Sequence, residues 1–211
     1  MKSILAFGDS NTWGLVPGSA PFARYSWEQR WTGVLQSYSN QIRILEEGLC
    51  GRTTIFDDAL RPGRNGLSSL PVILESQSPV ESVILMLGTN DCKQIYKASP
   101  YTIGKGIELC LQEIKKYVLP QNILLISPIY LGDDVWKPEK DPEFNRDSIA
   151  VSHELKEVYR EIANNFGCEF LAASDYAGPD EADEEHMSVN GHQALGKAVF
   201  AKLQSMGVLE A

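Results

Sequence analysis

Three histidines limit where acid–base chemistry can occur in this chain of 211 residues. A serine attacks a carbonyl carbon only when a base takes its proton. His153 falls inside a predicted helix, and His192 lies in the first turns of another. His186 instead lies in a loop, with Asp183 three residues before it, so the carboxylate can reach Nδ1 and leave Nε2 free. The alternative is that the acidic segment 180–185 is a solvated loop that merely precedes a helix.

Small and polar residues follow three of the predicted strands, at the point where each strand ends. The first cluster, 8–11, is Gly-Asp-Ser-Asn and exposes the hydroxyl of Ser10, and the other clusters are 46–54 and 87–91. The carboxyl ends of parallel strands meet at one edge of a sheet, where such folds bind their ligands. A plain turn explains any one cluster, but three clusters at one edge favour a functional site there.

Five short apolar segments with helical segments between them predict the elements that would position these clusters. The strands are predicted at 3–7, 42–46, 82–87, 122–127 and 169–172. The helices are predicted at 27–37, 67–76, 101–118, 148–166 and 189–206. Strands that are apolar on both faces indicate a parallel sheet covered by helices. We therefore expect one α/β domain over residues 1–211, a three-layer α/β/α sandwich with a five-stranded parallel sheet in flavodoxin-like order.

Two long segments between the predicted elements, 8–26 and 128–147, emerge at the same edge of the sheet. Loops of this length in a compact domain are usually functional or disordered. Trp13 in the first loop and Trp136 in the second are candidates for lining a substrate pocket, although each could equally pack beneath its own loop. Asp9 and Asn11, the neighbours of Ser10, are further pocket candidates.

Composition narrows the classes of partner. The net charge of −9 repels nucleic-acid backbones and anionic lipid surfaces, and no apolar run approaches the ~20 residues that cross a bilayer. The four cysteines are widely spaced, without the pairing typical of a metal site, and are interpreted as reduced thiols. The first apolar run is too short for a signal peptide. We expect a cytoplasmic protein that acts on a small molecule, without nucleic acid, membrane or metal.

The clusters and the histidine segment together resemble one known family. Gly8-Asp9-Ser10, the Gly51 segment, Gly88-Thr89-Asn90-Asp91, and Asp183 with His186 occur in the order of the SGNH (GDSL-type) hydrolases. The segments 46–49, 52–54 and 86–91 are similar to the bacterial arylesterase and acyltransferase branch. The resemblance extends from residue 3 to about residue 203.

The resemblance implies a role for each matching residue. Ser10 would be the nucleophile, His186 the general base and then acid, and Asp183 the residue that orients the histidine. The backbone N–H groups of Ser10 and Gly51, with the side-chain amide of Asn90, would form the oxyanion hole. The implied activity is that of a serine esterase that hydrolyses short-chain acetyl or aryl esters through an acyl-enzyme without a cofactor. Some members of the branch transfer the acyl group to alcohols, and some are homo-oligomers.

Two details of the chain depart from the family pattern or add to it. Position 11 is Asn where the family motif has Leu, which bears on local packing or substrate preference. Glu184 and Glu185 stand between Asp183 and His186, and we hypothesise that their negative charge raises the pKa of the histidine.

Other functions remain open from the residues alone. Within the same fold, the alternatives are a carbohydrate acetyl esterase and a thioesterase. A different class is a flavodoxin-like module that binds a small ligand without catalysis, although the chain has neither a G-x-G-x-x-G nor a P-loop motif. Phosphoryl transfer through Asp9 lacks the second acidic pair that a Mg²⁺ site needs.

Overall fold

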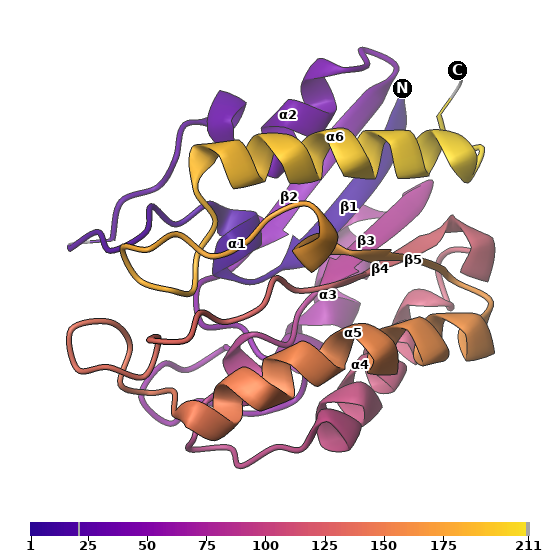
Figure 1. Cartoon of the computed structure of the whole chain (residues 1–211). Helices are drawn as coiled ribbons and strands as arrows, with labels where there is room; N and C mark the ends of the chain where they lie inside the picture. Colours follow the sequence, from indigo (N-terminus) through magenta and orange to yellow (C-terminus); the bar gives the residue numbers. More distant parts are fainter. Residues whose placement is uncertain (21, 210–211) are drawn as a thin grey trace.

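A five-stranded parallel sheet forms the centre of the molecule, with helices on both faces (Figure 1). The computed structural model describes residues 1–20 and 22–209. The strands are β1 (Lys2–Gly8), β2 (Ile42–Gly48), β3 (Ser82–Met86), β4 (Ile123–Ser127) and β5 (Glu169–Ala172). Their order is β2-β1-β3-β4-β5, the flavodoxin-like arrangement. The predicted three-layer architecture is therefore confirmed.

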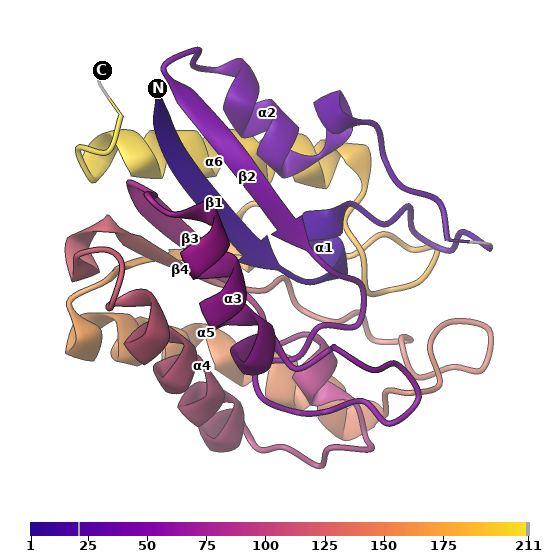
Figure 2. The same ribbon diagram turned by 180° about the vertical axis from the view of Figure 1, so that it is seen from behind.

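Alternate side chains of each central strand enter opposite cores. On β1, Leu5 and Phe7 belong to one apolar cluster, whereas Ile4 and Ala6 belong to the other. All four side chains are at most 1% exposed, as the period-two geometry of a covered strand requires. Helices α2 and α6 cover one face of the sheet, and α3, α4 and α5 cover the other (Figures 1 and 2).

The helices begin at the polar caps that helix N-termini prefer. Their bounds are α1 (Ser10–Trp13), α2 (Trp31–Ser37), α3 (Gly66–Gln77), α4 (Pro100–Ile114), α5 (Arg146–Phe166) and α6 (Val189–Ser205). The side chains of Asn65, Ser99, Asn145 and Ser188 each accept a hydrogen bond from the first turn that follows. In the described ranges, 1–20 and 22–209, no helix is long and apolar enough to cross a membrane.

Two of the predicted helices differ from the observed ones. The segment 27–37 is split into a 3₁₀ turn, Trp27–Gln29, and α2, because Arg30 between them has an extended backbone. The segment 101–118 is helical only to Ile114, after which the chain continues in turns. A four-residue helix, α1, was not predicted, and it lies inside the segment interpreted as a loop.

The register of the strands places the loops that carry the polar clusters close together at one edge of the sheet. Gly8, the last residue of β1, pairs with Gly48 on one side and with Met86 on the other. The chain therefore leaves β1, β2 and β3 at nearly the same level, and the next residues of all three strands are neighbours. This is the position beside the reversal of strand order at which doubly wound sheets bind ligands.

A buried tyrosine fixes the turn after β3. Tyr159 of α5 is fully buried, and its hydroxyl donates a hydrogen bond of 2.8 Å to the carbonyl oxygen of Leu87. Gly88 has φ +127°, and a Cβ at this position would lie 2.4 Å from the Tyr159 oxygen. Only glycine fits both the backbone angle and the space. Helix α5 thereby holds the turn that leads to Asn90.

Replacing Tyr159 by Phe removes this hydrogen bond and leaves a buried carbonyl without its donor. We expect the free energy of unfolding in urea to fall by about 1–3 kcal/mol. Tyr176→Phe is the matched control, because Tyr176 is 51% exposed and should lose little stability. Equal unfolding free energies for the two variants would show that Tyr159 does not hold the turn.

Candidate active site

Ser10 occupies the first position of the single helical turn α1, directly after β1. Asp9 caps this turn, with its Oδ1 accepting a hydrogen bond of 3.0 Å from the backbone N–H of Asn11. Gly14 ends the turn in the left-handed conformation. The serine is only 2% exposed, but it lines a cavity at the carboxyl edge of the sheet.

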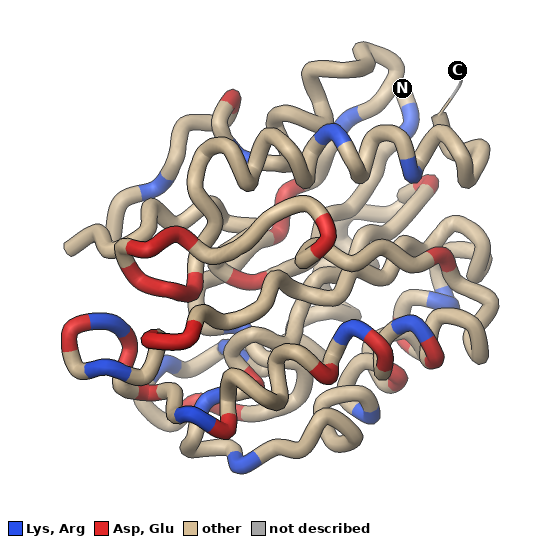
Figure 3. The backbone as a smooth tube through the Cα atoms, viewed as in Figure 1, with Lys and Arg blue, Asp and Glu red and all other residues tan. Residues whose placement is uncertain are grey.

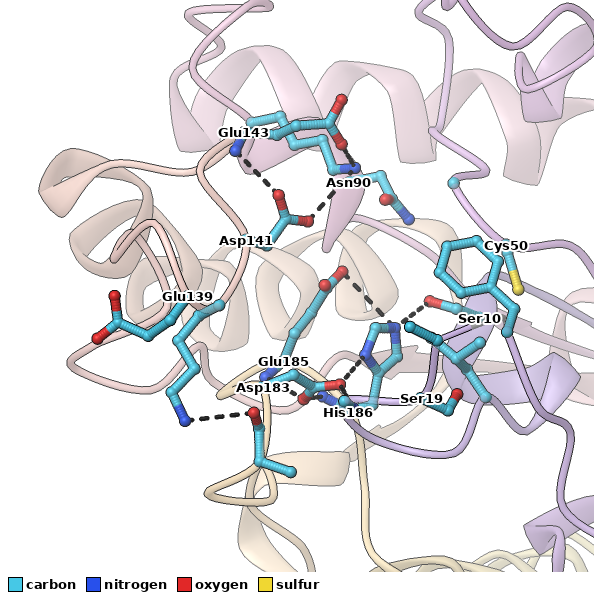
Figure 4. A pocket seen from close by; sticks show the side chains of 18 of the residues that line it. Ser10, Ser19, Cys50, Asn90, Glu139, Asp141, Glu143, Asp183, Glu185 and His186 are labelled. Atoms are coloured by element: carbon cyan, nitrogen blue, oxygen red, sulfur yellow. Dashed lines mark hydrogen bonds and ion pairs between the residues drawn. The ribbon is translucent and has the colours of Figure 1, made fainter.

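Ser10, His186 and Asp183 form a continuous hydrogen-bonded chain (Figure 4). The Ser10 Oγ lies 2.8 Å from the Nε2 of His186, and the Nδ1 of the same ring lies 2.8 Å from the Oδ2 of Asp183. A carboxylate can only accept, so in the neutral imidazole Nδ1 carries the proton and Nε2 is left to accept the serine proton. The three residues thus have the geometry of a nucleophile, a base and an orienting group.

Backbone donors hold the carboxylate of Asp183 in place. Its Oδ1 accepts hydrogen bonds from the N–H groups of Glu185 (3.0 Å) and His186 (2.9 Å), and its Oδ2 accepts one from Gly18 (2.9 Å). Burial alone would raise the pKa of Asp183, but the hydrogen bond with His186 and these donors leave the pKa below its usual value. Asp183 is therefore ionised at neutral pH.

Asn11 joins the serine turn to the histidine loop. Its Oδ1 accepts a hydrogen bond of 3.0 Å from the N–H of Met187, and its Nδ2 donates one of 3.3 Å to the carbonyl oxygen of Glu185. A leucine at this position could make neither bond. The departure from the family motif therefore supplies two hydrogen bonds that connect the segment carrying Ser10 to the segment carrying His186.

The loops after β2 and β3 bring hydrogen-bond donors to the cavity. Gly51, with φ +81°, and Asn90 both line it together with Ser10. The Asn90 Nδ2 donates a hydrogen bond of 3.1 Å to the carbonyl oxygen of Arg52, whose guanidinium donates to the carbonyl of Gly8 at 2.8 Å. Both carboxylate oxygens of Asp91 accept a hydrogen bond from the backbone N–H of Thr54, each at 3.0 Å. These bonds fasten the three loops to one another.

The cavity has a volume of about 450 Å³ and is bounded by both long loops. Residues from the first loop include Leu15, Gly18 and Phe22, and residues from the second include Glu139, Asp141 and Glu143. Figure 4 shows Ser10 and Cys50 on one side of the cavity and Glu139, Asp141 and Glu143 on the other. Both loops therefore border the cavity that contains Ser10, but through other residues than those predicted.

Four predicted pocket residues do not line the cavity, which corrects the sequence interpretation. Asp9 and Asn11 are buried and engaged in the hydrogen bonds described above. The ring of Trp13 lies under the guanidinium of Arg24, 4.9 Å from its centre. Trp136 donates to the carbonyl of Asp133 within its own loop, and a guanidinium covers its ring. Both tryptophans thus follow the alternative of packing within their loops.

The remaining histidines have other surroundings. His153 is exposed and stacks on Tyr130, with ring centres 4.0 Å apart. His192 is fully buried, and its Nδ1 accepts a hydrogen bond from the backbone N–H of Trp31. Burial lowers the pKa of His192 to about 3, so this side chain stays neutral and structural.

Glu185 is the acidic neighbour that acts on His186. Its Oε1 lies 3.8 Å from the histidine Nε2, whereas the Glu184 carboxylate lies against Gly132 and does not line the cavity. Burial alone would lower the pKa of His186, but the Glu185 charge, followed by the hydrogen bond and charge of Asp183, raises it to about 9. The hypothesis of a raised histidine pKa is thus supported, with Glu185 as its principal cause.

Cys50 also lines the cavity but is poorly suited to attack a carbonyl. Burial, together with the charges of Asp9 and Glu185, raises the pKa of its thiol to about 11. The thiolate is the nucleophilic form of cysteine, so Cys50 is almost entirely unreactive near neutral pH. Across residues 1–20 and 22–209, no group of three or more His, Cys, Asp and Glu side chains is arranged to hold a metal ion.

Comparison with known proteins identifies the family. The model of the GDSL-like lipase/acylhydrolase family matches residues 6–194. The chain belongs to this family. Two similar solved structures are the aryl esterase of M. smegmatis (32% identity, TM-score 0.88) and Est24, a carbohydrate acetylesterase from Sinorhizobium meliloti (34% identity, TM-score 0.89). Each covers 98% of this chain, which in turn covers 100% of each of them.

A more distant structure shares the fold. The lipase/acylhydrolase of Enterococcus faecalis has 21% identity and a TM-score of 0.70, covering 100% of this chain and 98% of its own. No curated protein matches the chain. The family match and the esterase structures show that this GDSL-like protein is a carboxylic ester hydrolase.

The charge of Glu185 should be visible in the pH dependence of the reaction. Because only neutral His186 can accept a proton, kcat/KM falls as the pH drops through the histidine pKa. We expect this fall above pH 6.5 in the wild type, since the pKa is raised. Glu185→Gln should move it downward by about 1 pH unit or more.

Glu184→Gln is the matched control, because it removes the same charge from the adjacent residue outside the cavity. It should leave the acid side of the pH profile nearly unchanged. A wild-type profile that falls at the pH of an ordinary histidine, or equal profiles for the two variants, would contradict the assigned role of Glu185.

Proposed function

We propose that this GDSL-like hydrolase is a serine esterase that cleaves short-chain acetyl and aryl esters through an acyl-enzyme on Ser10. The observation that carries the proposal is the chain of two 2.8 Å hydrogen bonds from Asp183 through His186 to the Ser10 hydroxyl, which lines the cavity. Cleavage of an ester through an acyl-enzyme requires a nucleophile, a base that then acts as an acid, and hydrogen-bond donors for the oxyanion, all at one place.

The first half of the reaction forms the acyl-enzyme. The Ser10 Oγ attacks the ester carbonyl carbon while His186 Nε2 takes the hydroxyl proton, and the carbonyl oxygen becomes an oxyanion. The N–H groups of Ser10 and Gly51 and the Asn90 amide stabilise that charge. Asn90 is suitable because an amide donates a hydrogen bond without transferring its proton. His186 then gives its proton to the leaving alcohol as the C–O bond breaks.

The second half releases the acyl group. A water molecule takes the place of the alcohol, loses its proton to His186 Nε2 and attacks the acyl carbon, after which Ser10 recovers its proton. An alcohol that fits the same position forms a new ester instead. We therefore expect hydrolysis and acyl transfer to compete at one site, with the alcohol concentration deciding between them.

The names of two solved relatives support an acetyl group and an aryl alcohol as the two halves of the substrate. One solved relative is an aryl esterase and another is a carbohydrate acetylesterase. The cavity of about 450 Å³ must hold the acyl group and part of the alcohol together. This volume suits an acetyl group with a ring-sized alcohol better than a long acyl chain.

Hydrolysis of a phenyl acetate tests the proposal. Ser10→Ala and Asp183→Asn should each lower kcat/KM by about 10⁴-fold, because one removes the nucleophile and the other leaves the histidine in the wrong tautomer. Ser19→Ala is the control, since this other cavity serine donates its hydroxyl to the carbonyl of Val16. It should lose less than about tenfold. Full activity in Ser10→Ala would refute the proposal.

A further inference from the structure

Glu185 carries a carboxylate that the protein itself leaves without a hydrogen-bond donor. The residue is 5% exposed and lines the cavity. Its backbone N–H and C=O are both bonded, but within residues 1–20 and 22–209 no donor reaches its side-chain oxygens. Among the described residues, the one basic atom within 4.0 Å of this carboxylate is the Nε2 of His186, at 3.8 Å (Figure 4). These oxygens open onto the cavity and are not sealed inside the protein, so a ligand that brings a positive charge next to them gains binding energy.

The cations of the cavity wall are already engaged elsewhere. Lys93 forms an ion pair with Glu143 and lies 3.9 Å from Asp141. Arg61 forms ion pairs with Asp58 at 2.8 Å and with Glu143 at 2.9 Å. The ammonium of Lys140 donates to the backbone carbonyls of residues 181 and 182. None of these three cations forms an ion pair with Glu185, although the more distant charge of Lys93 still favours its ionised form.

The balance of charge around the cavity is negative. Its wall carries five carboxylates against three Lys and Arg side chains, and the chain as a whole has a net charge of −9. Figure 3 shows acidic residues gathered in the loop that precedes α6, beside charged residues of the segment after β4. This field attracts cations and repels anionic esters.

The position of Glu185 assigns it to the alcohol half of the substrate. When the ester C–O bond breaks, the leaving oxygen must lie within hydrogen-bonding distance of His186 Nε2, which protonates it. The Glu185 carboxylate lies beside the same nitrogen. A cation two carbons from the leaving oxygen can therefore reach this carboxylate.

We propose that Glu185 selects esters of amino alcohols, whose cationic nitrogen two carbons from the ester oxygen pairs with its carboxylate. The inference rests on the proposed role of Ser10 and His186. A neutral hydroxyl on the alcohol could donate one hydrogen bond, but only a cation, with or without an N–H group, balances the negative charge of the carboxylate. The same pairing applies to a choline-like alcohol that enters as the acyl acceptor.

Protonation of His186 and binding of the cation are linked. The imidazolium balances Glu185 when the base is protonated, but the neutral imidazole that accepts the serine proton does not. A bound ammonium replaces the lost charge in the active form. The cation should therefore bind more tightly as the pH rises, and it should lower the histidine pKa by the same free energy.

Acetylcholine and 3,3-dimethylbutyl acetate provide the test, because they have the same shape and differ in charge. In the wild type, above the histidine pKa, we expect kcat/KM for acetylcholine to exceed that for the neutral ester by about tenfold or more. Glu185→Gln should bring the ratio near one. Glu139→Gln removes an exposed carboxylate from the cavity wall and should keep the ratio.

Several outcomes would overturn the inference. If the ratio of kcat/KM for acetylcholine to that for the neutral ester is near one in the wild type, or is unchanged in Glu185→Gln, then Glu185 does not recognise the positive charge of the substrate. A second comparison uses 2-hydroxyethyl acetate and propyl acetate. If Glu185→Gln loses the preference for 2-hydroxyethyl acetate but keeps the preference for acetylcholine, Glu185 recognises a hydroxyl and the inference is wrong. Using the ratio within each variant removes any common change in base strength.

A binding measurement separates this inference from the proposed function. If the wild type hydrolyses neither ester nor phenyl acetate, the esterase proposal fails by itself. Calorimetry with tetramethylammonium then still tests Glu185. Binding to the wild type that Glu185→Gln loses, and that weakens as the pH falls, supports the cation site; no binding to the wild type overturns it.

Discussion

The hydrogen bond between Ser10 Oγ and His186 Nε2 joins two segments that are 176 residues apart. It forms only because the sheet and the loops at its carboxyl edge bring these two segments together. Ser10 follows the inner strand β1, whereas His186 follows β5 at the edge of the sheet, with β3 and β4 between them. The chain after β5 must cross the carboxyl edge of the sheet before α6 begins. Helix α6 then packs beside α2, on the face next to β1 (Figure 1). Asn11 and the Gly18 N–H complete the connection by bonding to the crossing segment.

Negative charge dominates this meeting point, and each carboxylate has a different environment. Asp183 has three backbone donors and the histidine, which keep its pKa low. Asp9 accepts one backbone donor, and burial raises its pKa to about 6. Glu185 has no donor among the described residues, and burial raises its pKa as well. The same type of side chain therefore orients the base, caps the turn that carries the nucleophile, and presents to the cavity a carboxylate without a hydrogen-bond donor.

The sequence predicted the parts of this architecture that depend on local patterns. Buried apolar runs mark the strands, and caps such as Ser188 and Gly167 mark helix ends. The site residues could be chosen because few chemistries use a serine, a histidine and an aspartate at strand ends. The contacts of Asn11 were not predictable, since its partners lie 174 and 176 residues away. Nor was the choice between Glu184 and Glu185, which depends on how the chain turns at Glu184, where φ is +63°. The tryptophans failed as pocket residues because cationic side chains cover their rings.

Direct detection of the acyl-enzyme tests the central claim most sharply. The protein is mixed with an aryl acetate, quenched in acid within milliseconds, and digested for mass spectrometry. We expect one acetyl group on the peptide that contains Ser10, its loss in Ser10→Ala, and its persistence in Cys50→Ser. Acetylation of Cys50 instead, or turnover with no covalent acetyl group at any time, would contradict a serine nucleophile.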